Sequence, residues 1–226
     1  MPDYPSRVAL AEGFADTIAR HLAEAVASNG AAVLAVSGGS TPKRLFNELS
    51  TRALDWSAVS VVPVDERWVP EDSERSNARL IAENLLAHEA RAAGFVSLHH
   101  PTAEPETGID HVRLAVEALP QPFDVVVLGM GTDGHTASFF PGGDNLARAL
   151  RRDTPEIVVP MRAPGAGEPR ITLTLPVLLE ARHLYLHVEG EEKRTVLEAA
   201  EAGDDTAEMP VRAVLGAAQL EVVWAP

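Results

Sequence analysis

A histidine and an aspartate lie two residues apart in a glycine-rich segment that runs from Gly129 to Pro141. An imidazole changes its charge near neutral pH, and a nearby carboxylate can orient the ring or stabilise its charged form. Asp133 and His135 therefore predict general-base catalysis. The alternative is a histidine that is merely exposed on a loop.

The same segment contains the pattern Gly-x-Gly-x-x-Gly at Gly129, Gly131 and Gly134. In dinucleotide-binding proteins this pattern opens a helix that receives the pyrophosphate. We reject that interpretation, because Pro141 would cut the helix short and Pro160-Met161-Arg162 stands where an acidic residue should follow the next strand. The glycines instead predict a flexible turn that carries the Asp-His pair.

A second unusual segment is Ser37-Gly38-Gly39-Ser40-Thr41-Pro42. Paired glycines let backbone N–H groups approach a ligand closely, Thr41 could cap the following helix, and Pro42 suits its first turn. Exposed amides at a helix N-terminus bind anions well. The segment lacks the Gly-Lys-Ser/Thr ending of a P-loop, and a tight strand-to-helix turn without a ligand is the alternative.

A third segment begins at Asp65-Glu66-Arg67-Trp68-Val69-Pro70 and reaches Ser76-Asn77. Consecutive charged residues at the end of a buried strand must face solvent or a ligand. Arg67 could form a salt bridge with its neighbouring carboxylates, or it could hold a phosphate or an oxyanion in a cleft. Ser76 is a good N-cap residue for the next helix.

Two further cations stand out. Arg170 opens an apolar segment, and Lys193 lies in the first turn of a predicted helix, where a positive charge opposes the helix dipole unless an anion binds nearby. Ion pairing of Lys193 with Glu191 or Glu192 is the alternative. His99-His100 could ligate a metal, but further ligands at suitable spacing are missing. Seven histidines lack a setting like that of His135, namely His21, His88, His99, His100, His111, His183 and His187.

Composition limits the class of protein. The 226 residues include no cysteine, which excludes disulfides and thiolate chemistry, and 19 basic against 33 acidic residues give a net charge of −14. An acidic chain is a poor binder of nucleic acids or anionic membranes. The segment Met1–Ala11 lacks the features of a signal peptide, and no apolar stretch is long enough to span a bilayer, so we expect a cytoplasmic protein.

Helical periodicity alternates with short apolar segments along the chain, which indicates a mostly parallel sheet covered on both faces. We expect one domain over residues 1–226, with a mobile surface loop at Met161–Glu168. The expected helices are Ser6–Ser28, Pro42–Leu49, Ser76–Arg91, Ile109–Ala118 and Glu191–Ala200. The expected strands are Ala31–Val36, Val59–Val64, Phe123–Leu128, Ile157–Pro160, Ile171–Leu175, Leu184–Val188 and Leu220–Trp224. Ligands of such sheets bind beyond the carboxyl ends of the strands, where all three unusual segments fall.

The segments described above, together with Arg170-Ile171-Thr172-Leu173 and Lys193, resemble the successive motifs of the 6-phosphogluconolactonase family. The most specific is Asp133-Gly134-His135-Thr136-Ala137-Ser138 followed by Phe140-Pro141. Related glucosamine-6-phosphate deaminases continue differently after Asp-Gly-His and carry an aromatic residue at the position of Arg67. Two departures from the family are Phe139, where Leu is usual, and the glycine-rich loop before Arg170.

The resemblance implies a three-layer α/β/α sandwich of the ribose-5-phosphate-isomerase and glucosamine-6-phosphate-deaminase type. It also implies hydrolysis of 6-phospho-D-glucono-1,5-lactone in the oxidative pentose phosphate pathway, with no nucleotide cofactor and no required metal. A sugar-phosphate isomerase or deaminase, and a non-catalytic sugar-phosphate sensor, are the alternatives.

On this hypothesis His135 is the base, Asp133 orients it, and Arg67 or the Gly38-Gly39 amides meet the oxyanion. Arg170, Lys193 and the Ser40-Thr41 turn would hold the phosphate. The full set of residues expected to contact substrate beyond the catalytic His135, Asp133 and Arg67 is Gly38, Gly39, Ser40, Thr41, Asp65, Glu66, Gly129, Met130, Gly131, Arg170 and Lys193.

Overall fold

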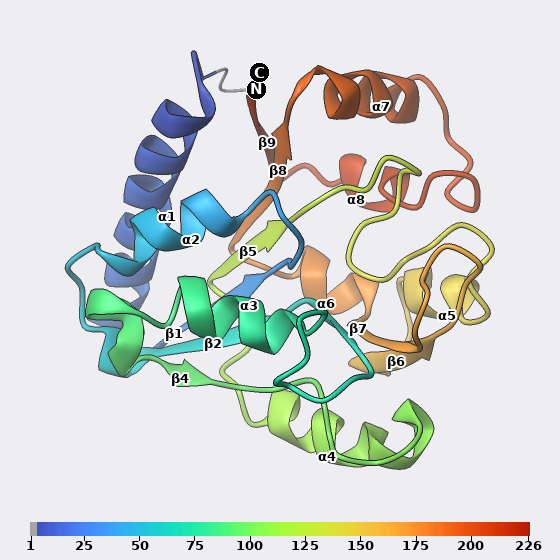
Figure 1. Cartoon of the computed structure of the whole chain (residues 1–226), viewed down its shortest axis with the longest axis horizontal. Helices are drawn as coiled ribbons and strands as arrows, with labels where there is room; N and C mark the ends of the chain where they lie inside the picture. Colours follow the sequence, from blue (N-terminus) through green and yellow to red (C-terminus); the bar gives the residue numbers. More distant parts are fainter. Residues whose placement is uncertain (1–3) are drawn as a thin grey trace.

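The chain, described here by a computed structural model over residues 4–226, is built around a six-stranded parallel sheet (Figure 1). Met1, Pro2 and Asp3 of the segment Met1–Ala11 lie outside the described residues. The strand order is β4-β2-β1-β5-β8-β9. The strands of this sheet are β1 (Ala32–Val36), β2 (Val59–Pro63), β4 (Gly94–Phe95), β5 (Val125–Leu128), β8 (His183–Glu189) and β9 (Leu220–Ala225).

A second, antiparallel sheet has the order β3-β7-β6. Its strands are β3 (Asp65–Arg67), β6 (Val158–Met161) and β7 (Arg170–Leu173). The sequence predicted strands at Ile157–Pro160 and Ile171–Leu175 as part of one mostly parallel sheet. The structure places them in this separate sheet instead, where β7 pairs with β6 on one side and with β3 on the other. Asp65, Glu66 and Arg67, which were expected only to follow the strand Val59–Val64, form a strand of their own, β3.

Helices cover both faces of the parallel sheet, which confirms the expected α/β/α layering (Figure 1). The α-helices are α1 (Arg7–Asn29), α2 (Lys43–Ser50), α3 (Asn77–Asn84), α4 (Pro105–Glu117), α5 (Leu146–Leu150), α6 (Leu175–Leu179), α7 (Glu191–Glu201) and α8 (Arg212–Leu215), and two short 3-10 helices are η1 (Trp56–Ala58) and η2 (His88–Ala92). None of the helices in residues 4–226 combines the length and apolar character that a membrane crossing requires.

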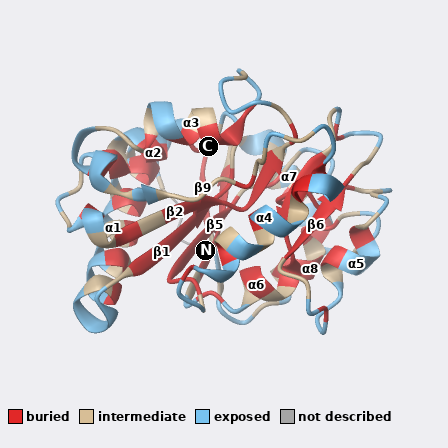
Figure 2. Ribbon diagram, turned by 90° about the horizontal axis from the view of Figure 1, so that it is seen from below, coloured by how far each residue is buried: buried red, intermediate tan, exposed pale blue. Residues whose placement is uncertain are grey.

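The alternation of side chains along the strands divides the core in two. Leu34 and Val36 of β1 pack with α1, α2 and α3 on one face, whereas Val33 and Ala35 pack with α4, α6, α7 and α8 on the other. The central strands are therefore buried on both sides (Figure 2). This explains why they are apolar throughout rather than alternating with polar residues.

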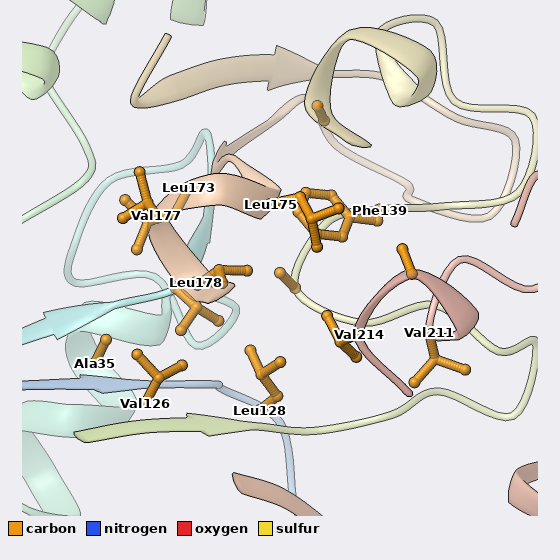
Figure 3. Close-up of a cluster of buried hydrophobic side chains, with 14 of the residues drawn as sticks. Ala35, Val126, Leu128, Phe139, Leu173, Leu175, Val177, Leu178, Val211 and Val214 are labelled. Atoms are coloured by element: carbon orange, nitrogen blue, oxygen red, sulfur yellow. The ribbon is translucent and has the colours of Figure 1, made fainter. Parts of the chain in front are cut away.

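The part of the core that lies under α4, α6, α7 and α8 also packs the small sheet against the large one. Figure 3 shows Ala35, Val126 and Leu128 of the parallel sheet facing Leu178, with Phe139 and Leu175 further out in the same cluster. Phe139, which replaces the leucine usual in the family that the chain resembles, is fully buried. The loop after β5 is thus held by apolar packing directly beside the positions of Asp133 and His135.

Several helix boundaries differ from those expected. Ser6 caps α1 and Gly30 ends it in a left-handed conformation, close to the expected limits. The expected helix Ser76–Arg91 stops at Asn84, because the backbone amides of Leu85 and Leu86 both turn back to the carbonyl of Ile81. The short elements β4, α5, α6 and α8 were not predicted, since each is too short to show a period.

Candidate active site

A cavity of about 260 Å³ lies beyond the carboxyl ends of β1, β5 and β8 and beside the small sheet. The three unusual segments meet there, as the position of the strand ends predicts. Of the expected site residues, those lining the cavity are Gly38, Gly39, Ser40, Thr41, Asp65, Arg67, Gly129, Met130, Gly131, His135, Arg170 and Lys193.

The imidazole of His135 is hydrogen-bonded to Asp133 and reaches the cavity. Nδ1 of His135 lies 2.5 Å from Oδ1 of Asp133, and the same oxygen accepts the backbone N–H of His135 at 3.1 Å. The ring stacks on Phe140 at a centroid distance of 4.3 Å. Because Nδ1–H donates to the carboxylate, Nε2 carries the lone pair that a general base requires.

Asp133 does not line the cavity itself, but its carboxylate contacts Nδ1 of His135, which does. Burial raises the pKa of Asp133, but the hydrogen bonds and charge from His135 outweigh that effect and bring the pKa below its ordinary value. The carboxylate is therefore ionised at neutral pH, in the state that can orient an imidazole.

The backbone of Gly131 must pass very close to this pair. A Cβ added at Gly131 would lie 2.2 Å from Nδ1 of His135 and 2.6 Å from Oδ1 of Asp133. The glycine also donates its N–H to the carbonyl of His135 at 2.9 Å. Glycine is thus required by the close approach, and no dinucleotide-binding helix follows it, since the next helix within residues 4–226 is the short α5.

Ser138 ties the histidine-bearing loop to the small sheet. Its hydroxyl donates to Oδ2 of Asp65 at 2.5 Å, and its backbone N–H donates to Oγ1 of Thr172 at 3.3 Å. Asp65 also accepts from Nδ2 of Asn77 at 3.3 Å, and a Cβ on Gly38 would lie 1.9 Å from the Asn77 side chain. Asp65 therefore joins the histidine-bearing segment to Asn77, and Asn77 in turn packs against Gly38 of the first segment.

Glu66 was expected to contact the substrate, but its carboxylate points away from the cavity, so that prediction is wrong. Residues of a strand alternate between faces, so Asp65 and Arg67 face the cavity while Glu66 faces the opposite way. Its carboxylate accepts the N–H groups of Asn77 and Ala78 at the start of α3, and the Ser76 hydroxyl. Burial raises the pKa of Glu66 despite these hydrogen bonds. The carboxylate caps α3, and Ser76 caps it as expected.

Arg67 forms no ion pair with a carboxylate in residues 4–226, so the salt-bridge alternative is wrong. Its guanidinium donates from Nη1 to the carbonyl of Arg75, while its buried Nε–H has no acceptor among these residues. Arg67 lies directly opposite Arg170 in the β3–β7 pair. Like charges in that position repel each other, which an anionic ligand would relieve.

Arg170 is buried, with 6% of its surface exposed, and lines the same cavity as Arg67. Its guanidinium donates from Nη2 to the carbonyl of Ala166 at 2.6 Å and lies 3.8 Å from Asp65. It also lies 5.3 Å from the centre of the Phe140 ring. Burial and, secondarily, the charge of Arg67 lower the pKa of Arg170.

Lys193 lies on the first turn of α7 and reaches across to the first segment. Its Nζ donates to the hydroxyl of Thr41 at 3.1 Å, and no carboxylate in residues 4–226 lies within ion-pair distance of it. The alternative of an ion pair with Glu191 or Glu192 is therefore wrong. Burial lowers the pKa of Lys193. The expected capping role of Thr41 is also wrong, because Pro42 occupies the N-cap position of α2.

His187 is a cavity residue that its sequence setting did not reveal. It lies near the end of β8, and its Nε2 is 2.9 Å from Oε1 of Glu189. Its position near the end of an apolar strand could have indicated from the sequence that it lies at the site. The other lining residues outside the expected set are Ser37, Pro42, Asn77, Val127, Leu128 and Ala137. No group of three or more metal-binding side chains occurs in the part of the chain described.

The fold and the cavity are those of an α/β enzyme, with a hydrogen-bonded His135–Asp133 pair and two cations, Arg67 and Lys193, that form no ion pair with residues 4–226. The chain matches the family of glucosamine-6-phosphate isomerases and 6-phosphogluconolactonase over residues 5–224. It belongs to that family.

Within the family, the chain groups with the 6-phosphogluconolactonase enzymes. It is 55% identical to the 6-phosphogluconolactonase of Rhizobium meliloti over 222 residues, which cover 96% of this chain and 95% of that protein. It is 49% identical to the 6-phosphogluconolactonase of Mesorhizobium japonicum, with coverages of 99% and 94%. The crystal structure of a 6-phosphogluconolactonase from Shewanella baltica superimposes with a TM-score of 0.96 at 42% identity, covering 99% of this chain and 96% of that one.

Proposed function

We propose that this protein hydrolyses 6-phospho-D-glucono-1,5-lactone to 6-phosphogluconate, the second step of the oxidative pentose phosphate pathway. The observation that carries the proposal is the His135–Asp133 pair beside Arg67 and Lys193, which have no carboxylate partner among residues 4–226, in a chain closely similar to 6-phosphogluconolactonases. A lactone is an activated ester, so its hydrolysis needs a positioned water, a base and a group that receives the oxyanion.

His135 acts as the base in this proposal. Nε2 takes a proton from the attacking water as the water oxygen bonds to the lactone carbonyl carbon, and the imidazolium then returns that proton to the ring oxygen as the C–O bond breaks. Asp133 holds the ring in the Nδ1–H tautomer and stabilises the imidazolium. General acid–base assistance of this kind is worth about 10²–10⁴-fold in rate.

Arg67 is our candidate for the oxyanion, together with the amides of Gly38 and Gly39 in the cavity wall. Arg67 lines the cavity, and its guanidinium has no carboxylate partner among residues 4–226, so it is available to a developing negative charge. One such donor contributes about 10²–10³-fold in kcat.

Lys193, Arg170 and the Ser40–Thr41 turn are our candidates for the phosphate. The half-buried ammonium of Lys193 hydrogen-bonds, among residues 4–226, only to the neutral hydroxyl of Thr41, and such a charge is poorly stabilised until an anion arrives. Arg170 adds a guanidinium that can bind phosphate oxygens in fork geometry.

The direct test generates the lactone enzymatically and follows acid release with and without the protein, with the spontaneous hydrolysis subtracted. Hydrolysis well above the spontaneous rate is expected. Release of ammonia from glucosamine-6-phosphate, with no effect on the lactone, would instead identify a deaminase.

Variants assign the roles. His135→Ala should lower kcat by about 10²–10⁴-fold with substrate affinity nearly intact, and near-normal turnover would remove His135 from the base role. Lys193→Ala and Arg170→Ala should raise KM, with a smaller effect on a lactone without phosphate. Equal losses with both lactones would show that the phosphate assignment is wrong.

A further inference from the structure

His187 is a polar side chain in the cavity wall that the proposed mechanism does not use. Only 2% of its side chain is exposed, and it faces the same side of β8 as Tyr185. Phe14 of α1 packs edge-on against both rings, at centroid distances of 4.9 Å from Tyr185 and 5.8 Å from His187. An apolar residue would satisfy this packing, so the packing alone does not explain an imidazole here.

The imidazole is held by a carboxylate from its own strand. Nε2 of His187 lies 2.9 Å from Oε1 of Glu189, whose side chain is 10% exposed. A buried imidazole and carboxylate are costly to desolvate, so a gain in stability does not by itself account for this pair. The other ring nitrogen, Nδ1, makes no hydrogen bond to any residue in 4–226, and the ring lines the cavity.

The charges around His187 suit an anion. Lys193 of α7 lines the same cavity, and Arg7 of α1 lies 3.7 Å from Oε2 of Glu189. The negative groups in this region are Glu189 itself and Glu192 of α7. Glu189 is paired with Arg7 on one oxygen and with His187 on the other, and no carboxylate in residues 4–226 lies within ion-pair distance of Lys193.

We propose that His187, held by Glu189, binds the phosphate group of the substrate beside Lys193 and so helps to select phosphorylated lactones. With Nε2–H donating to Glu189, Nδ1–H donates to a phosphate oxygen, and the imidazolium bridges the carboxylate and the ligand. Glu189 is a positioning residue in this arrangement. The inference rests on the proposed function, since it takes the sugar phosphate as the ligand.

Two amide variants separate the two ring nitrogens. In His187→Gln the side-chain nitrogen falls near the position of Nε2, so the contact with Glu189 is kept and the donor toward the cavity is lost. In His187→Asn the nitrogen falls near Nδ1, so the cavity donor is kept and the contact with Glu189 is lost. Glu189→Gln keeps an acceptor for Nε2–H, whereas Glu189→Ala does not.

Steady-state kinetics on 6-phosphogluconolactone and on gluconolactone, with 6-phosphogluconate binding measured by calorimetry, test the inference. His187→Gln should raise KM for the phosphorylated lactone and Kd for 6-phosphogluconate by about tenfold or more, as expected for a lost hydrogen bond to a charged group. Its kcat should stay within about twofold, and gluconolactone kinetics should not change. His187→Asn should recover part of the affinity, and Glu189→Gln should be milder than Glu189→Ala.

Unaltered KM and Kd in a folded His187→Gln, or an equal rise for both lactones, would overturn the inference. If His187→Gln does not fold, a His187→Ala or Glu189→Ala protein with unchanged phosphate selectivity would overturn it as well. A wild-type protein that neither hydrolyses the lactone nor binds 6-phosphogluconate would overturn the proposed function too. Normal wild-type activity with an unaffected His187→Gln overturns this inference alone.

Discussion

Replacing Asp133 by asparagine isolates the charge of the group behind His135. Oδ1 of Asp133 accepts both the ring Nδ1–H and the backbone N–H of His135. An asparagine oxygen can accept both hydrogen bonds in the same way, because the two donors together fix which side of the amide faces them. Asp133→Asn should therefore keep the ring orientation and tautomer and remove only the negative charge.

The size of the loss follows from the surroundings of the pair. Two unit charges about 4 Å apart interact by roughly 1 kcal/mol in water and roughly 4 kcal/mol near a protein surface. The side chains of His135 and Asp133 are 31% and 44% exposed, which places the pair toward the aqueous end of that range. We expect about 1–2 kcal/mol less stabilisation of the imidazolium, or a fall in kcat of about 5- to 30-fold.

The assay compares kcat and KM of Asp133→Asn, Asp133→Ala and His135→Ala on freshly generated lactone. Asp133→Ala also loses the orientation of the ring, so its kcat should lie between those of Asp133→Asn and His135→Ala, with KM nearly unchanged in all three. An Asp133→Asn enzyme as impaired as His135→Ala would refute the argument from charge alone. An Asp133→Ala enzyme with wild-type kcat would refute any role for the pair.

Three other substitutions test the surroundings of the site. Gly131→Ala should lower kcat about 10²-fold, because the new Cβ would lie 2.2 Å from Nδ1 of His135. The control Gly216→Ala, whose new Cβ has nothing within 4 Å, should keep wild-type kinetics. Equal kcat values for the two variants would contradict the close approach of Gly131 to His135. Arg67→Met should lower kcat by about 10²–10³-fold in the same assay, and a pure KM effect would remove it from the oxyanion role. Glu66→Gln should lower the free energy of unfolding, measured with urea, by about 1–3 kcal/mol. Both carboxylate oxygens of Glu66 accept hydrogen bonds, and the amide nitrogen of a glutamine cannot. Because burial raises the pKa of Glu66, the folded state holds its proton more tightly than the unfolded state, and the wild type gains stability over Glu66→Gln as pH falls through that pKa. A difference in the free energy of unfolding between the wild type and Glu66→Gln that shrinks as the pH falls would contradict this prediction.

The amino-acid sequence by itself determined the elements whose patterns are local. The apolar segments that became β1, β2, β5 and β8 were predictable, because strands buried on both faces carry few polar residues. Ser6 and Ser76 were predictable as helix caps, because capping is a contact between residues close in sequence. The site at the strand ends followed from the topology of parallel sheets.

Tertiary structure alone decided which charged groups pair and which remain available to a ligand. Asp65, Glu66 and Arg67 are adjacent in sequence, yet β3 sends Glu66 to the start of α3 and leaves Arg67 opposite Arg170 in the cavity. Ion pairs and hydrogen bonds depend on distances between segments far apart in the chain, which residue spacing does not encode. For the same reason, only the packing of β8 against α1 brought His187 into the wall of the cavity, and only the fold left Lys193 with Thr41 instead of a carboxylate.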